Sequence, residues 1–280
     1  MSKLLQRIFS AAILTFIVLS GEAISEVDGF FHIYYVDVGQ ADAAIITCDD
    51  MVLMIDGGNV EDSSLIYSML QNALGIDHID YMIATHPHED HIGGLSGALK
   101  ACTVDVLYTP VTEYDTKAFN SMMDKAYAQG TVILSPQSGD TFYIGSAVAE
   151  ILAPLKSYDT CNDMSIVVRV IYGDTRFLFT GDIEWEAEHD IVNAGIDLSA
   201  DVLKVSHHGS SSSSSYVFLR EVIPAYAIVS VGRNNSYGHP DEDTLSRLRN
   251  VGAMIMRTDE SGMIECISDG NSIAILSNQE

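Results

Sequence analysis

A chain of 280 residues with 47% hydrophobic and 19% charged residues has the composition of a folded globular protein, which excludes a disordered or low-complexity chain. Its 14 Lys and Arg against 39 Asp and Glu give a formal net charge of −25, which argues against the basic patch that most nucleic-acid-binding modules use. The charge does not exclude a nucleic-acid substrate held through bound cations, because their positive charge is local.

The N-terminus has the three parts of a secretory signal. Lys3 and Arg7 precede an apolar run over residues 8–19, and small and polar residues follow it. The run is shorter than the ~20 apolar residues of a membrane-spanning helix. We predict a signal peptide over 1–25, with an uncleaved anchor as the alternative, and one domain over 26–280. This domain is expected to be extracellular or extracytoplasmic, and to contact a membrane only if the N-terminal segment stays attached.

Hydrophobic periodicity predicts alternating strands and helices along the rest of the chain. We expect strands over 30–38, 43–48, 51–55, 79–84, 104–108, 131–134, 147–152, 165–172, 177–180, 201–205 and 225–229, with a β-rich tail. We expect helices over 62–74, 95–101, 116–128, 184–192 and 241–250. Because both halves mix strands and helices without a long linker, the pattern favours two sheets covered by helices in one domain.

Four cysteines are spaced too far apart for a C-x-x-C metal motif: Cys48, Cys102, Cys161 and Cys266. In an exported protein they could form one or two disulfides. Buried free thiols within strands are an equally good interpretation, and the sequence leaves both open.

The strongest chemical signal is the run T-H-P-H-E-D-H at residues 85–91, directly after a predicted strand. Three imidazoles crowded together are costly when charged, and binding a divalent cation relieves that cost. His86 and His88 are two residues apart, so in an extended segment they project to the same side and can share one ion. Asp90 and His91 follow at a turn and can face a second ion.

Two other strands end in residues of the same chemical kind. Asp182 follows the strand over 177–180, where its carboxylate could bridge two cations or could cap the following helix. His207 and His208 follow the strand over 201–205. The six serines at 210–215 come directly afterwards, which favours an active-site loop over a flexible surface loop.

Taken in order, H-x-H-x-D-H, T-G-D and a strand ending in His resemble the metallo-β-lactamase-fold hydrolase superfamily. Four further runs resemble the extracytoplasmic hydrolase domain of ComEC-type competence proteins: D-V-G-Q-A-D-A (37–43), I-D-G-G (55–58), L-K-V-S-H-H-G-S (203–210) and Y-G-H-P (237–240). The likeness runs from about Phe30 to the C-terminus, without the channel of those proteins. It implies an α+β fold, a four-layer αββα sandwich, for the domain over 26–280.

The resemblance also implies two divalent cations, with zinc favoured and manganese as an alternative. It assigns the ligands as follows: His86 and His88 on the first ion, Asp90 and His91 on the second, and Asp182 between them. His207 or His208 would complete the second site. We prefer His207, because the family's last ligand usually closes the strand, and His208 would then lie over the substrate as a catalytic residue.

One feature departs from the family pattern: there is no His between His91 and Asp182 to serve as a third ligand of the first ion. The matching segment offers Asn162 and Asp163, which could bind the ion weakly or only order the loop. Oxygen ligands there would widen the choice of metal toward manganese.

Three more residues are assigned roles other than binding a cation. The match suggests that His239 donates a proton to the leaving oxygen, with a surface imidazole in a turn as the alternative. Asp42 and Asp56 are expected to support the histidine loop by hydrogen bonding, although both could be simple turn carboxylates.

The expected function is a secreted metal-dependent hydrolase, most simply a phosphodiesterase or nuclease that uses a metal-activated hydroxide oriented by Asp90. The subfamily likeness points to DNA strand degradation during DNA uptake. No Lys or Arg lies between Arg7 and Lys100, so stable nucleic-acid binding by the surface is not expected, and a short or polymeric phosphodiester remains open. The alternatives are another ester or amide (a phosphocholine ester, a lactone or a lactam) and a non-catalytic metal-stabilised binding module. The oligomeric state is left open.

Overall fold

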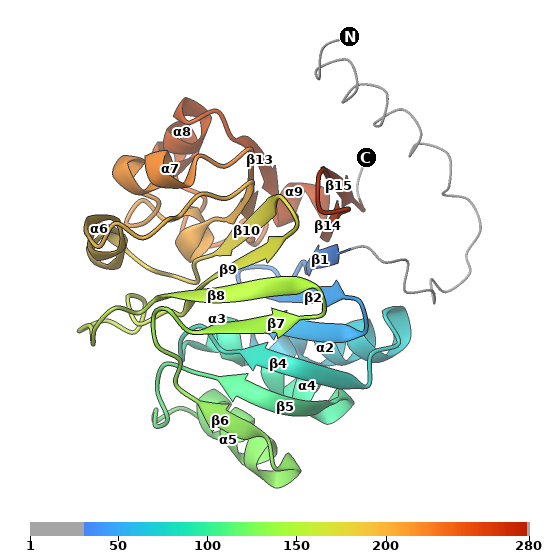
Figure 1. The fold of residues 1–280 in the computed structure, drawn as a ribbon. Helices are drawn as coiled ribbons and strands as arrows, with labels where there is room; N and C mark the ends of the chain where they lie inside the picture. The colour runs from blue at the N-terminus through green and yellow to red at the C-terminus, as the bar shows by residue number, and fades with distance from the viewer. Residues whose placement is uncertain (1–30, 279–280) are drawn as a thin grey trace, which may run out of the picture.

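The computed structural model describes residues 31–278, so the predicted signal peptide over 1–25 lies outside the described residues. Two sheets form the centre of this part of the chain (Figure 1). The first has the order β15 (Ile273–Ser277), β14 (Ile264–Ser268), β1 (Phe31–Tyr35), β2 (Ala44–Cys48), β3 (Met51–Ile55), β4 (His78–Ile83), β5 (Thr103–Tyr108) and β6 (Val132–Leu134). The second has the order β13 (Met254–Arg257), β12 (Tyr226–Val229), β11 (Val202–Lys204), β10 (Thr175–Phe179), β9 (Val167–Tyr172), β8 (Ala147–Ala153) and β7 (Thr141–Ile144).

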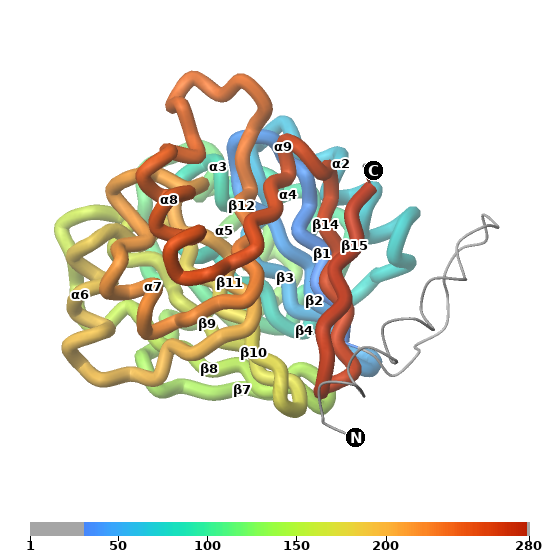
Figure 2. Tube along the Cα trace, turned by 90° about the horizontal axis from the view of Figure 1, so that it is seen from above, coloured from blue at the N-terminus to red at the C-terminus, as the bar shows by residue number. Residues whose placement is uncertain are grey.

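Helices cover the outer face of each sheet (Figure 2). Those on the first sheet are α2 (Ser63–Ser68), with short helical turns η1 (Val60–Asp62) and η2 (Met69–Ala73) at its ends, α4 (Leu95–Ala101) and α5 (Lys117–Gln129). Those on the second are α6 (Trp185–Asn193), α7 (Tyr216–Val222) and α8 (Glu242–Asn250). The short helices α3 (Glu89–Ile92), η3 (Ser206–Gly209) and α9 (Thr258–Ser261) follow strands.

Three layers of apolar side chains hold these elements together. Along β10, Phe177 and Phe179 enter the core between the sheets, while Leu178 between them packs under the helices of the second sheet. This is the alternation that a strand buried on both faces requires. Phe119 of α5 packs in the third core, under the helices of the first sheet. Four layers in the order helix, sheet, sheet, helix confirm the predicted αββα sandwich.

Parallel strands bring the candidate residues to one edge of the molecule. β3, β4 and β5 are parallel, and so are β10, β11, β12 and β13. Carboxyl ends of parallel strands meet at the same edge, where ligands of α/β sheets commonly bind. The histidine loop follows β4, Asp182 follows β10, and His207 and His208 follow β11.

The sequence patterns missed several elements, among them β7, α7 and the short helices α3, η3 and α9. β7 is too short to give a clear period, and α7 carries aromatic and β-branched residues that weaken its helical signal. The signal for α7 was its N-cap: the last residue of the serine run, Ser215, accepts a hydrogen bond from the backbone N–H of Phe218 at 3.3 Å.

All four cysteines are free thiols, so the disulfide interpretation is wrong for this structure.

Within residues 31–278, none of the helices combines the length and the apolar character needed to cross a membrane.

Candidate metal centre

Asp182 lies at the centre of the candidate site, on the turn between β10 and α6. Its Oδ1 is 3.2 Å from Nε2 of His91, and its Oδ2 is 3.8 Å from Nε2 of His86. Oδ2 is also 3.9 Å from Nε2 of both His207 and His208. The turn depends on Gly181, which has a φ of +51° and whose added Cβ would lie 2.9 Å from the Ser165 side chain.

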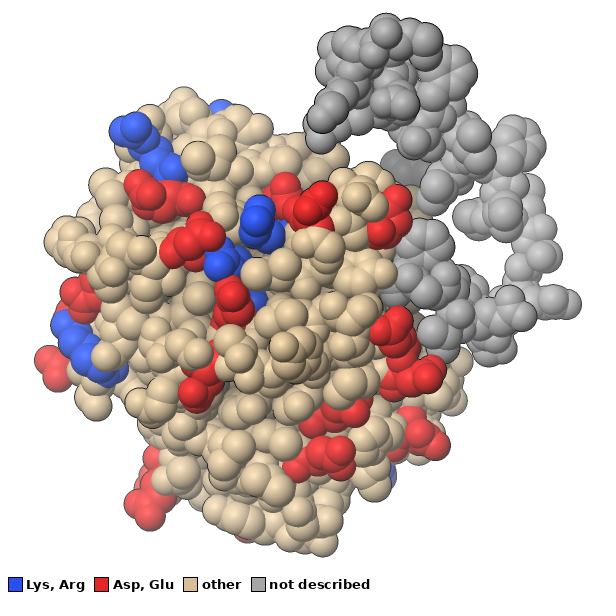
Figure 3. Space-filling view, in the orientation of Figure 1, with Lys and Arg blue, Asp and Glu red and all other residues tan. Residues whose placement is uncertain are grey.

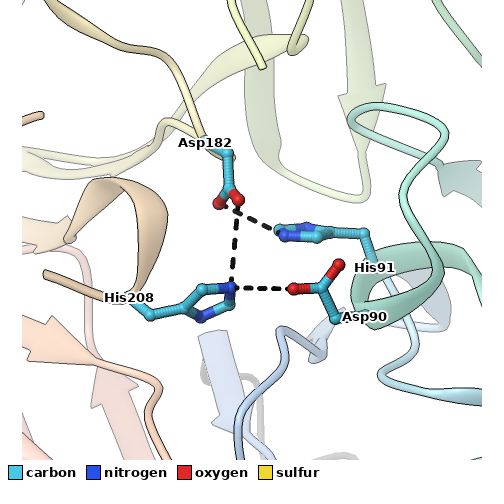
Figure 4. A group of neighbouring side chains, drawn as sticks. All are labelled: Asp90, His91, Asp182 and His208. Carbon is cyan, nitrogen blue, oxygen red and sulfur yellow. Dashed lines mark ion pairs between the residues drawn. The ribbon is translucent and has the colours of Figure 1, made fainter. Parts of the chain in front are cut away.

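Asp90, His91, Asp182 and His208 form one group that could hold a cation, with ligand atoms all within 4.8 Å of one another. Asp90 and His91 come from α3, and His208 approaches from the opposite side on η3 (Figure 4). Asp182 lies between the two sides, so residues distant in the chain converge on one point.

His86 and His88 form a second group, which reaches Oδ2 of Asp182 through His86. Nε2 of His86 is 3.0 Å from Nδ1 of His88. The opposite ring nitrogen of His86 faces two hydroxyl groups, those of Thr85 at 3.2 Å and Ser165 at 3.3 Å. These hydroxyls fix the ring of His86 so that Nε2 points at His88 and Asp182.

Unpartnered buried atoms test whether a metal ion fits this group. Nε2 of His91, Nε2 of His208 and Oδ1 of Asp182 are buried and find no hydrogen-bond partner among the described residues. Nδ1 of His91 donates to Asp56 Oδ2 at 2.8 Å, and Nδ1 of His208 donates to the carbonyl of Ser230 at 3.0 Å. Because Nδ1 carries the proton of each neutral ring, each Nε2 presents a lone pair to carboxylate oxygens. Acceptors that face acceptors in a buried site need a proton or a cation between them, and imidazole and carboxylate are ligands of zinc and related ions.

The pKa values follow from the same arrangement. Burial lowers the pKa of His208, but Asp182 and Asp42 outweigh it and raise this pKa to about 10. The pKa of His91 is likewise raised, because Asp182 and Asp56 outweigh burial. Although burial alone would raise the pKa of Asp182, the rings of His91 and His208 hold it well below its usual range. The carboxylates therefore stabilise positive charge at this point.

The geometry favours His208 over His207 as the last ligand, which reverses the preference drawn from the sequence. Both residues have positive φ angles, 51° and 52°, so the chain leaves β11 in a left-handed turn rather than as a continuing strand. This turn buries His208 at 2% exposure and leaves the side chain of His207 24% exposed. His207 therefore lies on the solvent-facing side of the centre, and His208 lies on the buried side.

Glu184, which the sequence interpretation did not consider, orients His207. Its Oε1 lies 3.4 Å from Nδ1 of His207 and accepts a hydrogen bond from the Ser212 hydroxyl at 2.7 Å. Its position two residues after the expected bridging Asp182 was the only signal available in the sequence.

Asp56 and Asp42 lie behind the ligands. Asp56 accepts hydrogen bonds from the backbone N–H and the hydroxyl of Thr85, at 2.8 and 2.7 Å, as well as from His91. Asp42 Oδ1 is 3.4 Å from Nδ1 of His208, and the backbone N–H of Asp42 donates to the carbonyl of Asp90 at 3.0 Å. Asp56 thus lies where it can support the histidine loop by hydrogen bonding, whereas Oδ1 of Asp42 has no hydrogen-bond partner among the described residues and faces His208 through its charge.

Replacing Asp56 with Asn is expected to weaken the binding of a cation at His91. The amide presents an NH₂ group as well as an oxygen, so it no longer selects the His91 tautomer that leaves Nε2 free. A loss of about 10- to 100-fold in metal affinity is expected, measured by chelator competition. Asp201→Asn is the control, since Asp201 accepts from Arg176 N at 2.9 Å at the start of β11, and an equal loss there would contradict the role of Asp56.

Asp163 orders a loop rather than contacting the centre. Its Oδ1 accepts the backbone N–H groups of Glu184 at 2.8 Å and Ala187 at 3.4 Å, at the start of α6. The capping role considered for Asp182 thus belongs to Asp163. The neighbouring Asn162 has a buried Oδ1 with no hydrogen-bond partner in the described part of the chain, so it stays the candidate oxygen ligand of this segment.

His239 lies beside His207, with ring centroids 5.9 Å apart, on the loop after β12. Its Nδ1 is buried without a hydrogen-bond partner within residues 31–278. Burial and the charges of His207 and His208 lower its pKa, so the free ring is neutral at pH 7. The structure therefore brings His239 to the site, in place of the surface turn that was the alternative.

The serine run is tightly held rather than flexible. The buried carboxylate of Glu188 accepts the backbone N–H groups of Ser214 and Ser215, the latter at 2.8 Å. Arg247 donates to the carbonyls of Ser213 and Ser214 at 2.9 and 2.8 Å. These bonds fix the loop that carries Ser212 to the edge of the centre.

Glu188 is expected to make stability depend on pH. Burial raises its pKa from 4.5 to about 7, more than the hydrogen bonds from Ser215 and Ser214 lower it. Between these values the folded state holds a proton that the unfolded state has released, so the free energy of unfolding falls as pH rises through this window. In the wild type, the free energy of unfolding should fall by roughly 2–3 kcal/mol between about pH 5 and about pH 8, measured by urea unfolding. Glu188→Gln should remove this fall. The exposed Glu186→Gln should keep the fall, and a wild-type curve without it would contradict the prediction.

Comparison with known proteins identifies related sequences. Residues 36–233 match the family described as the metallo-beta-lactamase superfamily. ComE operon protein 3 of Bacillus subtilis is 30% identical over 249 residues, which cover 82% of this chain and 32% of that protein. Competence protein ComA of Neisseria gonorrhoeae is 31% identical over 232 residues, covering 82% and 31% respectively. Recombination protein 2 of Haemophilus influenzae is 28% identical over 235 residues, covering 81% and 28%. The chain thus spans about a third of the length of these relatives.

Solved structures agree on the fold. The metallo-beta-lactamase fold protein YhfI of Bacillus subtilis has a TM-score of 0.56 at 13% identity, covering 84% of this chain and 99% of that one. The metallo hydrolase Igni18 of Ignicoccus hospitalis has a TM-score of 0.54 at 13% identity, covering 89% and 100%. At such low identity these likenesses concern the arrangement of the strands and helices alone.

Proposed function

The chain belongs to the metallo-beta-lactamase superfamily, and we propose that it is an extracytoplasmic phosphodiesterase that cleaves DNA or nucleotides with two divalent cations. The observation that carries the proposal is the pair of buried ring nitrogens without a hydrogen-bond partner among the described residues, Nε2 of His91 and of His208, that face the carboxylates of Asp182 and Asp90. His86 and His88 would hold one cation, and Asp90, His91 and His208 the other. Asp182 would contact both.

Bound cations would supply a hydroxide nucleophile at neutral pH and positive charge for the transition state. The protein side chains supply position. Asp90 is one-third exposed while its Oδ2 lies 3.4 Å from Nε2 of His208, so it reaches both the solvent and the centre and can orient the attacking water. His239, neutral at pH 7, would donate an N–H hydrogen bond to the leaving oxygen from beside His207.

The charge distribution favours a short substrate segment over a long bound polyanion. Asp and Glu are spread across the face in Figure 3, whereas Lys and Arg gather mostly over the part built from the C-terminal half. A protein that neutralises few phosphates gains little from counterion release. The substrate would therefore be held at the cations, through one or a few phosphates, rather than along the surface.

The names of the relatives support DNA as the substrate class, since one is a competence protein and another a recombination protein. The N-terminal sequence supports a place outside the cytoplasm. Zinc is the favoured metal, because imidazoles supply most of the ligands. The first group has two histidines and no third, and an oxygen ligand such as the unpartnered Oδ1 of Asn162 would leave manganese as the alternative.

The proposal is tested by metal analysis of the purified chain together with assays on bis-p-nitrophenyl phosphate, single-stranded DNA and a chromogenic lactam. We expect two divalent ions per chain, cleavage of both phosphodiesters and no turnover of the lactam. Turnover of the lactam alone would assign the chain to amide hydrolysis. Bound metal without turnover of any ester or amide would support the non-catalytic binding module.

A further inference from the structure

Lys204 is a buried lysine directly behind the metal centre. It is the last residue of β11 and is 4% exposed. Its Nζ donates to Asp42 Oδ2 at 2.7 Å and to the carbonyl of Val205 at 3.1 Å. A buried ammonium group is costly unless it is paired, so this contact is a specific feature of the site rather than a surface ion pair.

Asp42 connects Lys204 to the ligands. While its Oδ2 accepts from Lys204, its Oδ1 lies 3.4 Å from Nδ1 of His208. Its backbone N–H donates to the carbonyl of Asp90, on the short helix that carries two further ligands. Asp42 therefore contacts Lys204 and His208 through its carboxylate, and the helix that carries Asp90 through its backbone N–H.

The carboxylates of Asp42 and Asp56 place negative charge in this buried region, which a fixed positive charge would stabilise. Asp42, Asp56 and His91 offer ligand atoms within 4.8 Å of one another, a second buried group with the composition of a cation site. The cavity beside them, lined by Asp42, Asp56, Thr85 and Lys204 among others, measures only about 10 Å³, room for about one water. The ammonium group of Lys204 supplies positive charge here, and together with His208 it lowers the pKa of Asp42 although burial raises it.

We propose that Lys204 is a positioning residue for the second cation: by fixing Oδ2 of Asp42 it keeps the charge of Oδ1 beside Nδ1 of His208, and together with the hydrogen bond from Nδ1 to the Ser230 carbonyl this holds the ring with Nε2 toward Asp90 and Asp182. Lys204 also keeps Asp42 from turning toward the cation itself. The inference rests on the proposed two-cation centre, but not on the proposed substrate.

The test is the affinity of the metal-free full-length chain for two equivalents of Zn²⁺, measured by chelator competition. Lys204→Met removes the charge and keeps the length of the side chain. We expect the second equivalent to bind about 10- to 100-fold more weakly while the first is unchanged, as for loss of other residues behind metal ligands. Wild-type affinity for both equivalents in this variant would overturn the proposal.

Arg169→Met is the matched control on the same sheet. Arg169 is 7% exposed, and its Nη2 lies 2.7 Å from Glu150 Oε2, so the variant also removes a buried cation that is paired with a carboxylate. It should lower the thermal unfolding temperature and leave both Zn²⁺ affinities unchanged. An equal loss of the second equivalent here would show that any buried ion pair has this effect, which would overturn a specific role for Lys204.

The double variant Lys204→Met with Asp42→Asn tests the route through Asp42, and it leaves no unpaired buried charge if Lys204→Met alone fails to fold. If Lys204 acts through Asp42, the double variant binds the second Zn²⁺ as Asp42→Asn alone does. A further loss in the double variant would overturn the route. If the chain binds two cations in this pattern but cleaves no phosphodiester, the proposed function is wrong and the inference about Lys204 stands.

Discussion

If the proposed two-cation phosphodiesterase is right, replacing Asp182 with Ala is expected to release at least one of the two cations and to lower phosphodiester cleavage by about 10³-fold or more. Its two oxygens face different histidines, His91 on one side and His86 on the other. Loss of the carboxylate therefore removes a ligand from both groups at once. It also removes the negative charge that offsets the cations in a fully buried site.

Asp163→Ala is the matched control for Asp182, because it removes a buried carboxylate from a neighbouring loop. Asp163 accepts hydrogen bonds at the start of α6, so its loss should cost about 1 kcal/mol of stability. The metal content should stay at the wild-type level. Retention of both ions and of the full rate in Asp182→Ala would refute the bridging role.

The second large effect is expected at His208. His208→Ala should no longer bind the second cation, and its kcat should fall by at least about 10²-fold. The reason is that this ring is buried in the group with Asp90, His91 and Asp182. His207→Ala should keep both cations, because the ring of His207 is partly exposed and lies outside that group. We expect His207→Ala to act mainly on KM, as for a residue that contacts the substrate.

Metal content by elemental analysis, followed by kcat and KM for bis-p-nitrophenyl phosphate, separates the two variants. The opposite outcome, with the second cation lost from His207→Ala and kept in His208→Ala, would restore the assignment drawn from the sequence. Equal metal loss in both variants would mean that the two rings share the site.

Much of the site could be predicted because the residues of the histidine loop lie close together in the sequence. The ligand-bearing residues from His86 to His91 lie within six positions, so their spacing alone brings them together at the end of a strand. The family resemblance supplied the sandwich and the position of Asp182, and the comparisons confirm both the family and the fold. The helix α7 escaped prediction because aromatic and β-branched residues fill a segment of only seven positions.

What the sequence by itself determined is the identity of the chemical groups and the family to which they belong. Only the tertiary structure decided which of two adjacent histidines points inward, because the left-handed backbone at His207 and His208 cancels the alternation that a strand would impose. It also decided that Lys204 is paired with Asp42, a contact between residues 162 positions apart. Periodicity and spacing report on neighbours along the chain, whereas the direction of a side chain and its distant partner depend on how the two sheets pack face to face.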